Sequence, residues 1–130
     1  MNIPQTKLFE AANTVRKNAY APYSKYQVGA ALLTKTGEII AGCNIENAAY
    51  PVGMCAEFSA IGQAISRGFR EFEAMCVTTD SAGTPCGKCR QMIAEICGDI
   101  PIYIADGTGI KQTVTSYQLL PFAFLADKLK

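Results

Sequence analysis

Histidine is absent from the 130-residue sequence. Its absence excludes a Ser-His-Asp or Cys-His catalytic group and every histidine-ligated metal site. Acid–base chemistry near neutral pH must therefore come from Glu, Asp, Lys, Tyr, Cys or a metal-bound water. Long apolar runs are also absent, because no stretch approaches the roughly 20 residues of a membrane span or the apolar core of a signal peptide. We therefore expect a cytoplasmic protein with no membrane partner.

Charge is scarce and evenly divided between the two signs. Charged residues make up 18% of the chain, with 12 basic and 11 acidic side chains and a net charge of +1. No basic cluster is present that could neutralise phosphates, so nucleic acid is not an expected partner. The low charged fraction leaves apolar surface to cover, which favours oligomerisation. Hydrophobic residues reach 49%, enough for one core in a single domain spanning residues 1–130.

Hydrophobic periodicity predicts strands that alternate with helices. The expected helices cover residues 5–19, 55–66 and 86–97, and the expected strands cover 28–33, 38–41, 74–79, 102–105 and 112–115. A terminal helical segment is expected around 119–125, interrupted by Pro121. A long loop at 44–54 joins the second strand to the second helix. This alternation predicts an α/β sandwich built on a largely central sheet.

The six cysteines are the main chemical feature of the sequence. In a reducing cytosol they indicate metal ligands, core residues or catalytic groups rather than disulfides. Cys55 starts one expected helix, and Cys86 and Cys89 start the next one, 31 residues after Cys55. The strand between these helices returns the chain to the same region, so the three sulfurs should converge where two helix N-termini meet. The positive ends of the helices favour thiolate over thiol.

Three sulfur ligands leave one zinc coordination position for water, which is the pattern of a catalytic site. Glu57 can face the same metal if Cys55 occupies the helix cap, and a carboxylate beside zinc-bound water can move protons. A structural four-sulfur site is the alternative. Cys43 is the only serious candidate for the fourth ligand, because Cys76 lies mid-strand and Cys97 lies at the far end of its helix.

A resemblance to a known protein family extends well beyond the metal motif. Residues 21–25 (APYSK), 28–32 (VGAAL), 43–50 (CNIENAAY) and 85–89 (PCGKC) resemble the cytidine deaminase family, specifically its small homotetrameric three-cysteine zinc class. The resemblance implies a three-layer α/β/α sandwich with a mixed five-stranded central sheet. It also implies one Zn²⁺ per chain and hydrolytic deamination of cytidine and 2′-deoxycytidine in pyrimidine salvage, with one small pyrimidine nucleoside as the substrate.

The resemblance assigns roles to residues of this chain. A zinc-bound hydroxide would attack C4 of the cytosine ring, while Glu57 carries its proton to N3 and then to the amino group. The implied substrate contacts are Tyr26 on the base, Asn44 and Glu46 on the sugar hydroxyl, Ala56 in the pocket, and Phe124 reaching a neighbouring subunit's site in a homotetramer with shared active sites.

Phe58 departs from the family pattern, because the small class usually has arginine directly after the glutamate. An arginine there would offset the formal −1 charge of zinc with three thiolates and hydrogen-bond the sulfurs. Phenylalanine does neither, so the helix N-termini must carry more of the compensation, with Arg90 as a further candidate. The simpler alternative is that Phe58 only extends the apolar helix face formed by Ile61 and Ile65.

Alternatives to this function stay open at this point. The changed surroundings of the metal could broaden tolerance for groups at C4, and the substrate could be another aminopyrimidine nucleoside such as blasticidin S. A third reading, of a different class, is a zinc-stabilised module that binds nucleosides without turning them over.

Overall fold

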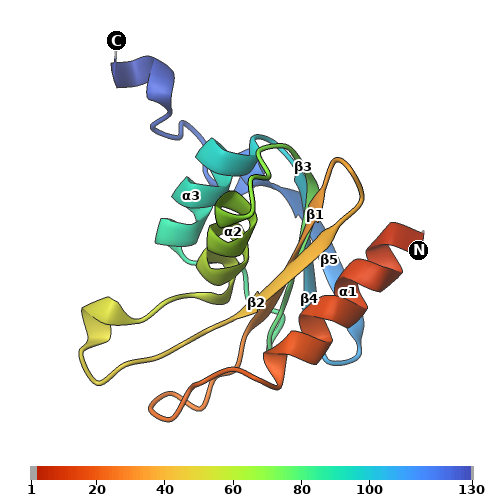
Figure 1. The fold of residues 1–130 in the computed structure, drawn as a ribbon, viewed down its shortest axis with the longest axis vertical. Coiled ribbons are helices and arrows are strands. Elements are labelled where there is room, and N and C mark those ends of the chain that lie inside the picture. Colours follow the sequence, from red (N-terminus) through yellow and green to blue (C-terminus); the bar gives the residue numbers. More distant parts are fainter. Residues whose placement is uncertain (1–2, 130) are drawn as a thin grey trace.

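A sheet of five strands forms the centre of the computed structural model, which describes residues 3–129 (Figure 1). Residues 1, 2 and 130 of the expected domain lie outside this range. The strand order is β2-β1-β3-β4-β5. The strands are β1 (Gly29–Thr34), β2 (Ile39–Cys43), β3 (Phe72–Thr78), β4 (Pro101–Asp106) and β5 (Gly109–Thr115). Only the β3–β4 pair is parallel, so the sheet is mixed.

Helices cover both faces of this sheet. Helix α1 (Ile3–Arg16) lies on one face, and helices α2 (Ala56–Ser66) and α3 (Gly87–Cys97) lie on the other (Figure 1). Successive strand residues point to opposite faces, so Ala31 of β1 packs in the core under α1 and Leu32 packs in the core under α2 and α3. The prediction of a three-layer α/β/α sandwich is confirmed. No helix within residues 3–129 has the length and apolar character needed to cross a membrane.

Two glycines allow helices to approach the sheet closely. A Cβ atom at Gly29 of β1 would lie 2.0 Å from the carbonyl oxygen of Ala12 in α1. A Cβ atom at Gly42 of β2 would lie 2.6 Å from the backbone nitrogen of Ala60 in α2. Real Cβ atoms do not tolerate such distances, so glycine at these positions sets the spacing of both helix layers.

The predicted interruption of the terminal helical segment at Pro121 is confirmed, but the helical parts lie before and after residues 120–125 rather than within them. The structure has a short helix α4 (Ser116–Leu119), whose N-terminus is closed by a capping box between Thr115 and Gln118. Pro121 has no backbone N–H and restricts the residue before it, so the helix ends and Leu120 takes a non-helical conformation with φ −138° and ψ 75°. Residues 121–125 are a turn and irregular chain, and a short 3₁₀ helix follows at Ala126–Leu129. The first helix also ends at Arg16, three residues before its predicted end.

Candidate active site

The first turns of α2 and α3 bring three cysteines together. Cys55 and Cys86 are the N-cap residues of these helices, both with extended backbone, and Cys89 lies in the first turn of α3. Their sulfurs all lie within 4.8 Å of one another, and the Cys55 and Cys86 sulfurs are 3.9 Å apart. Tetrahedral zinc with Zn–S bonds of about 2.3 Å would separate its sulfur ligands by about 3.8 Å. The three side chains therefore fit one zinc ion.

No fourth ligand joins this group among the His, Cys, Asp and Glu side chains of residues 3–129. Cys76 is buried in β3, while Cys43 and Cys97 are half-buried elsewhere, and all six cysteines are free thiols. Burial raises the pKa of each of these three outlying thiols, as expected for small core residues. The three-sulfur group thus leaves one coordination position open.

The sulfurs share their protons unequally. A hydrogen bond from the Cys89 thiol lowers the pKa of Cys55 to about 6, and the Cys86 thiol and the positive charge of Lys88 act in the same direction against the effect of burial. The same hydrogen bond, together with burial, raises the pKa of Cys89. The thiolate form is therefore favoured at Cys55, which caps the positive end of α2.

Glu57 lies beside the cysteines in the first turn of α2. Its side chain is only 4% exposed. Burial raises its pKa from 4.5 to about 7, and a backbone hydrogen bond and the nearby Cys55 modify this value in opposite directions. A carboxyl group that is half protonated near neutral pH can both accept and donate a proton.

A cavity of about 550 Å³ opens in front of these groups. Cavities of this size hold drug-sized or nucleoside-sized molecules. Its lining includes the expected site residues Tyr26, Asn44, Glu46, Cys55, Ala56, Glu57 and Cys86, and the further residues Val28, Thr79 and Lys88. Segments far apart in sequence therefore meet around one pocket, as the resemblance implies.

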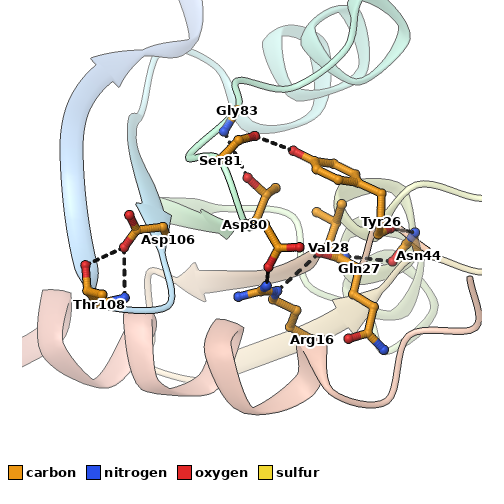
Figure 2. Close-up of polar contacts among 11 residues, drawn as sticks. Arg16, Tyr26, Gln27, Val28, Asn44, Asp80, Ser81, Gly83, Asp106 and Thr108 are labelled. Atoms are coloured by element: carbon orange, nitrogen blue, oxygen red, sulfur yellow. Dashed lines mark hydrogen bonds and ion pairs between the residues drawn. The ribbon is translucent and has the colours of Figure 1, made fainter. Parts of the chain in front are cut away.

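Asn44 fixes the segment that leads into β1. Its side-chain oxygen accepts a hydrogen bond from the backbone N–H of Val28 at 2.8 Å, and its amide nitrogen donates to the carbonyl oxygen of Tyr26 at 2.9 Å (Figure 2). The Tyr26 hydroxyl reaches across to Ser81, with 3.0 Å between the two oxygens. An amide has four hydrogen-bonding positions, so Asn44 keeps capacity for a ligand after these two bonds.

Sequence reasoning missed Arg16, which joins two walls of the pocket. From the last turn of α1, Arg16 donates from Nε to the carbonyl oxygen of Gln27 at 3.2 Å and forms an ion pair with Asp80 (Figure 2). Gln27 follows Tyr26, and Asp80 precedes Ser81. Helix α1 lies on the far face of the sheet, and no local motif signals this contact, so only the assembled fold reveals it.

Glu46 is held by the turn at residues 23–24. One carboxylate oxygen accepts from the backbone N–H groups of Tyr23 at 3.0 Å and Ser24 at 3.1 Å, and the other accepts from the Ser24 hydroxyl. These bonds, the Ser24 hydroxyl first, lower the pKa of Glu46. The carboxylate is therefore charged and oriented at the cavity wall.

Phe124 does not join the other expected site residues. Among the described residues, Lys88 is the last in sequence that lines the cavity, so no residue of the C-terminal segment takes part. The Phe124 side chain is 57% exposed, and its carbonyl oxygen accepts a hydrogen bond from Gln91 at 2.6 Å. Phe124 is therefore not part of the cavity of its own chain.

Arg90 and Phe58 occupy different surroundings. Arg90 donates to the carbonyl oxygens of Pro85 at 2.7 Å and Leu119 at 2.9 Å, and to the Thr84 hydroxyl at 2.9 Å. It thus holds the loop before Cys86 against the last residue of α4. The Phe58 ring, by contrast, faces the Lys88 ammonium group, 4.9 Å from the ring centroid.

Comparisons with known proteins agree with the zinc-binding group and the cavity described above. The profile of the cytidine and deoxycytidylate deaminase zinc-binding region matches residues 3–104. A cytidine deaminase of Sporosarcina psychrophila is 47% identical over 126 residues, covering 95% of this chain and 93% of the relative. A blasticidin-S deaminase of Bacillus cereus is 35% identical over 112 residues, covering 78% of this chain and 79% of the relative.

A solved structure extends the likeness to three dimensions. The crystal structure of cytidine deaminase from Burkholderia pseudomallei matches with a TM-score of 0.88 and 39% identity, covering 95% of this chain and 100% of that chain. The profile match includes both helix N-termini that carry the sulfurs, and the fold match includes the sheet that brings them together. This chain therefore belongs to the zinc-binding family of cytidine and deoxycytidylate deaminases.

Proposed function

We propose that this chain deaminates cytidine and 2′-deoxycytidine by hydrolysis, giving uridine or 2′-deoxyuridine and ammonia, as an enzyme of pyrimidine salvage. The observation that carries the proposal is a buried carboxyl group, Glu57, beside three sulfurs that fit zinc, at one end of a nucleoside-sized cavity. When bound, zinc would supply a Lewis acid that lowers the pKa of a water molecule to about 7. Relatives named cytidine deaminase at 47% and 45% identity support this substrate class.

Glu57 moves the protons in this proposal. It accepts one proton from the attacking water and delivers it to N3 of the ring. It then transfers the second proton of that water to the amino group at C4, which leaves as ammonia. The water oxygen stays on C4, so all atoms of the water molecule are accounted for. A pKa raised to about 7 suits a group that must take up and release protons near neutral pH.

The other residues that line the cavity are proposed to bind the sugar and the base. The charged Glu46 and the remaining hydrogen-bonding positions of Asn44 are proposed to bind ribose hydroxyls. Tyr26 packs on the base, and the backbone of Ala56 lies beside the pyrimidine edge. Each of these side chains lines the same cavity as Glu57, which supports their assignment.

The identity of the base is tested by a side-by-side panel. Zinc-loaded protein should lower the ultraviolet absorbance of cytidine and 2′-deoxycytidine, because conversion to uridines changes the chromophore. A faster reaction with blasticidin S would favour that alternative, which a 35% identical relative of that name supports more weakly. Absence of reaction with every aminopyrimidine nucleoside, despite measured binding, would favour a non-catalytic module. Comparable rates on analogues with larger C4 groups would establish broadened tolerance.

We also propose a homotetramer in which Phe124 completes the cavity of a neighbouring subunit. The support is an exposed aromatic ring outside its own cavity, and a set of exposed apolar side chains in two loops, at residues 20–23 and 45–54, the second of which contributes to the cavity lining: Tyr20, Tyr23, Ile45, Tyr50, Val52 and Met54. Sedimentation velocity combined with activity across dilution tests this arrangement. A fully active monomer would contradict it. The six free thiols support a cytoplasmic location.

A further inference from the structure

A cation–π contact joins the two helices that carry the sulfurs. The Lys88 ammonium nitrogen lies 4.9 Å from the centroid of the Phe58 ring. Phe58 is in the first turn of α2, three residues after Cys55, and Lys88 is in the first turn of α3, between Cys86 and Cys89. A lysine over an aromatic face is attracted to the electron-rich ring. The Phe58 ring therefore limits where the flexible Lys88 side chain can place its charge.

Lys88 lines the cavity together with two of the sulfur ligands. Lys88 is the single cationic side chain among the described residues that line the cavity, and it shares that lining with Cys55 and Cys86. Lys88 also stands between Cys86 and Cys89 in the first turn of α3, and the three sulfurs of the group lie within 4.8 Å of one another. Its position in the chain therefore brings the ammonium group close to the sulfur cluster.

Arg90, the other cation in the first turns of α2 and α3, is already engaged elsewhere. Its three guanidinium nitrogens donate to Pro85, Leu119 and Thr84, so its hydrogen bonds go to the loop before Cys86 and to the end of α4. Phe58 has no charge of its own. Of the two cationic side chains in these first turns, Lys88 is thus the one that faces the Phe58 ring and lines the cavity.

We propose that Lys88, oriented by the Phe58 ring, is the positioning residue that offsets the negative charge of the zinc–thiolate group in this chain. The inference rests on the zinc site of the proposed function. Three thiolates around Zn²⁺ carry a formal charge of −1, and a nearby fixed cation lowers the free energy of that charged group. The Phe58 ring and the Lys88 ammonium group then together take the role of the arginine that the family usually has at position 58.

Zinc release measures this effect without relying on turnover. The zinc-loaded protein is mixed with excess colorimetric chelator, and the rate of transfer is recorded. Lys88→Met should speed zinc release by roughly 3- to 10-fold, at or below the 10- to 100-fold typical of groups that bind metal ligands directly. Phe58→Leu, which keeps the lysine but removes the ring, should speed it by about 2- to 5-fold, the size of an exposed cation–π contact. Lys111→Met, on the exposed strand β5, is the matched control and should release zinc at the parental rate.

Three further measurements separate a charge effect from a packing effect. The double variant should release zinc no faster than Lys88→Met, because the ring acts only through the lysine. Lys88→Arg should retain the parental rate, and Phe58→Arg should restore slow release in the Lys88→Met background. Added salt should narrow the gap between Lys88→Met and the parent, because the exposed charge is screened.

Parental release rates in Lys88→Met, or additive effects of the two single variants, would overturn the inference. So would failure of both arginine substitutions to retain or restore slow release. These results leave the proposed function untouched if the parent binds zinc and deaminates cytidine. A parent that binds no zinc and converts no nucleoside would instead overturn the proposed function itself, so the two failures are distinguishable.

Discussion

Replacing Glu57 with glutamine should stabilise the metal-free protein while it inactivates the zinc-loaded one. The carboxyl group is 4% exposed, and burial, opposed by a backbone hydrogen bond and aided by Cys55, raises its pKa from 4.5 to about 7. Since one pH unit corresponds to about 1.4 kcal/mol, ionising this group in the folded metal-free protein costs about 3 kcal/mol. Glutamine has nearly the same volume and no charge to bury.

The sign of the effect depends on pH. Between pH 4.5 and about 7 the folded protein holds the Glu57 proton and the unfolded chain releases it. The contribution of this proton to stability is therefore complete below the unfolded pKa and is lost as the pH rises to about 7. Relative to the parent, Glu57→Gln should gain most of about 3 kcal/mol in unfolding free energy between pH 5 and pH 8.

Urea unfolding of chelator-treated, reduced protein at pH 5 and pH 8 measures this gain. Glu95→Gln, which changes an exposed carboxylate on α3, is the control and should show no such trend. In the zinc-loaded form, Glu57→Gln should lower kcat on cytidine by about 10²- to 10⁴-fold, the usual contribution of one positioned acid–base group. A stability difference that does not widen with pH would refute the burial argument, and near-parental turnover would show that another group moves the proton.

Three more outcomes are expected. X-ray absorption should find one zinc per chain with three sulfurs at about 2.3 Å and one lighter ligand, and a four-sulfur shell would argue against catalysis. Tyr26→Phe removes the hydroxyl that bonds Ser81 and should raise KM for cytidine by about 2- to 5-fold with kcat unchanged, since a net hydrogen bond of this kind contributes about 1 kcal/mol. An equal fall in kcat would mean that the hydroxyl matters to the chemical step. Gly42→Ala should destabilise the fold by about 3 kcal/mol in thermal or urea unfolding, because its Cβ would lie 2.6 Å from the α2 backbone. Gly62→Ala is the control in α2: the added Cβ meets nothing within 4 Å, so the variant should be neutral or stabilising by about 0.5–1 kcal/mol.

Much of the fold could be predicted because its signals are local. Apolar periodicity located α2 and α3 and all five strands to within a few residues, and the spacing of the cysteines implied that two helix starts meet. The expected cap position of Cys55 is confirmed by its extended backbone. The break at Pro121 could also be predicted, but the bounds of the C-terminal helix could not, because α4 is only four residues long and depends on a capping box rather than on an apolar face.

The parts of the site that escaped prediction depend on contacts between distant segments. Arg16 and Asp80 are 64 residues apart, and each is an unremarkable charged residue in its own sequence context. Lys88 is also unremarkable in sequence, because a lysine within a metal motif gives no information on the direction of its side chain. Its position over Phe58 follows from the packing of α2 beside α3, which no single segment encodes.

The contacts of Arg16 tie the docking of α1 to the shape of a pocket on the opposite face of the sheet. Its guanidinium group reaches both the segment after Tyr26 and the loop before Ser81, so detachment of the last turn of α1 would release two pocket walls together (Figure 2). Ligand binding and helix docking are then linked equilibria, and each favours the other by the same factor. A nucleoside in the cavity should therefore slow amide hydrogen exchange in the last turn of α1, a helix that it does not touch.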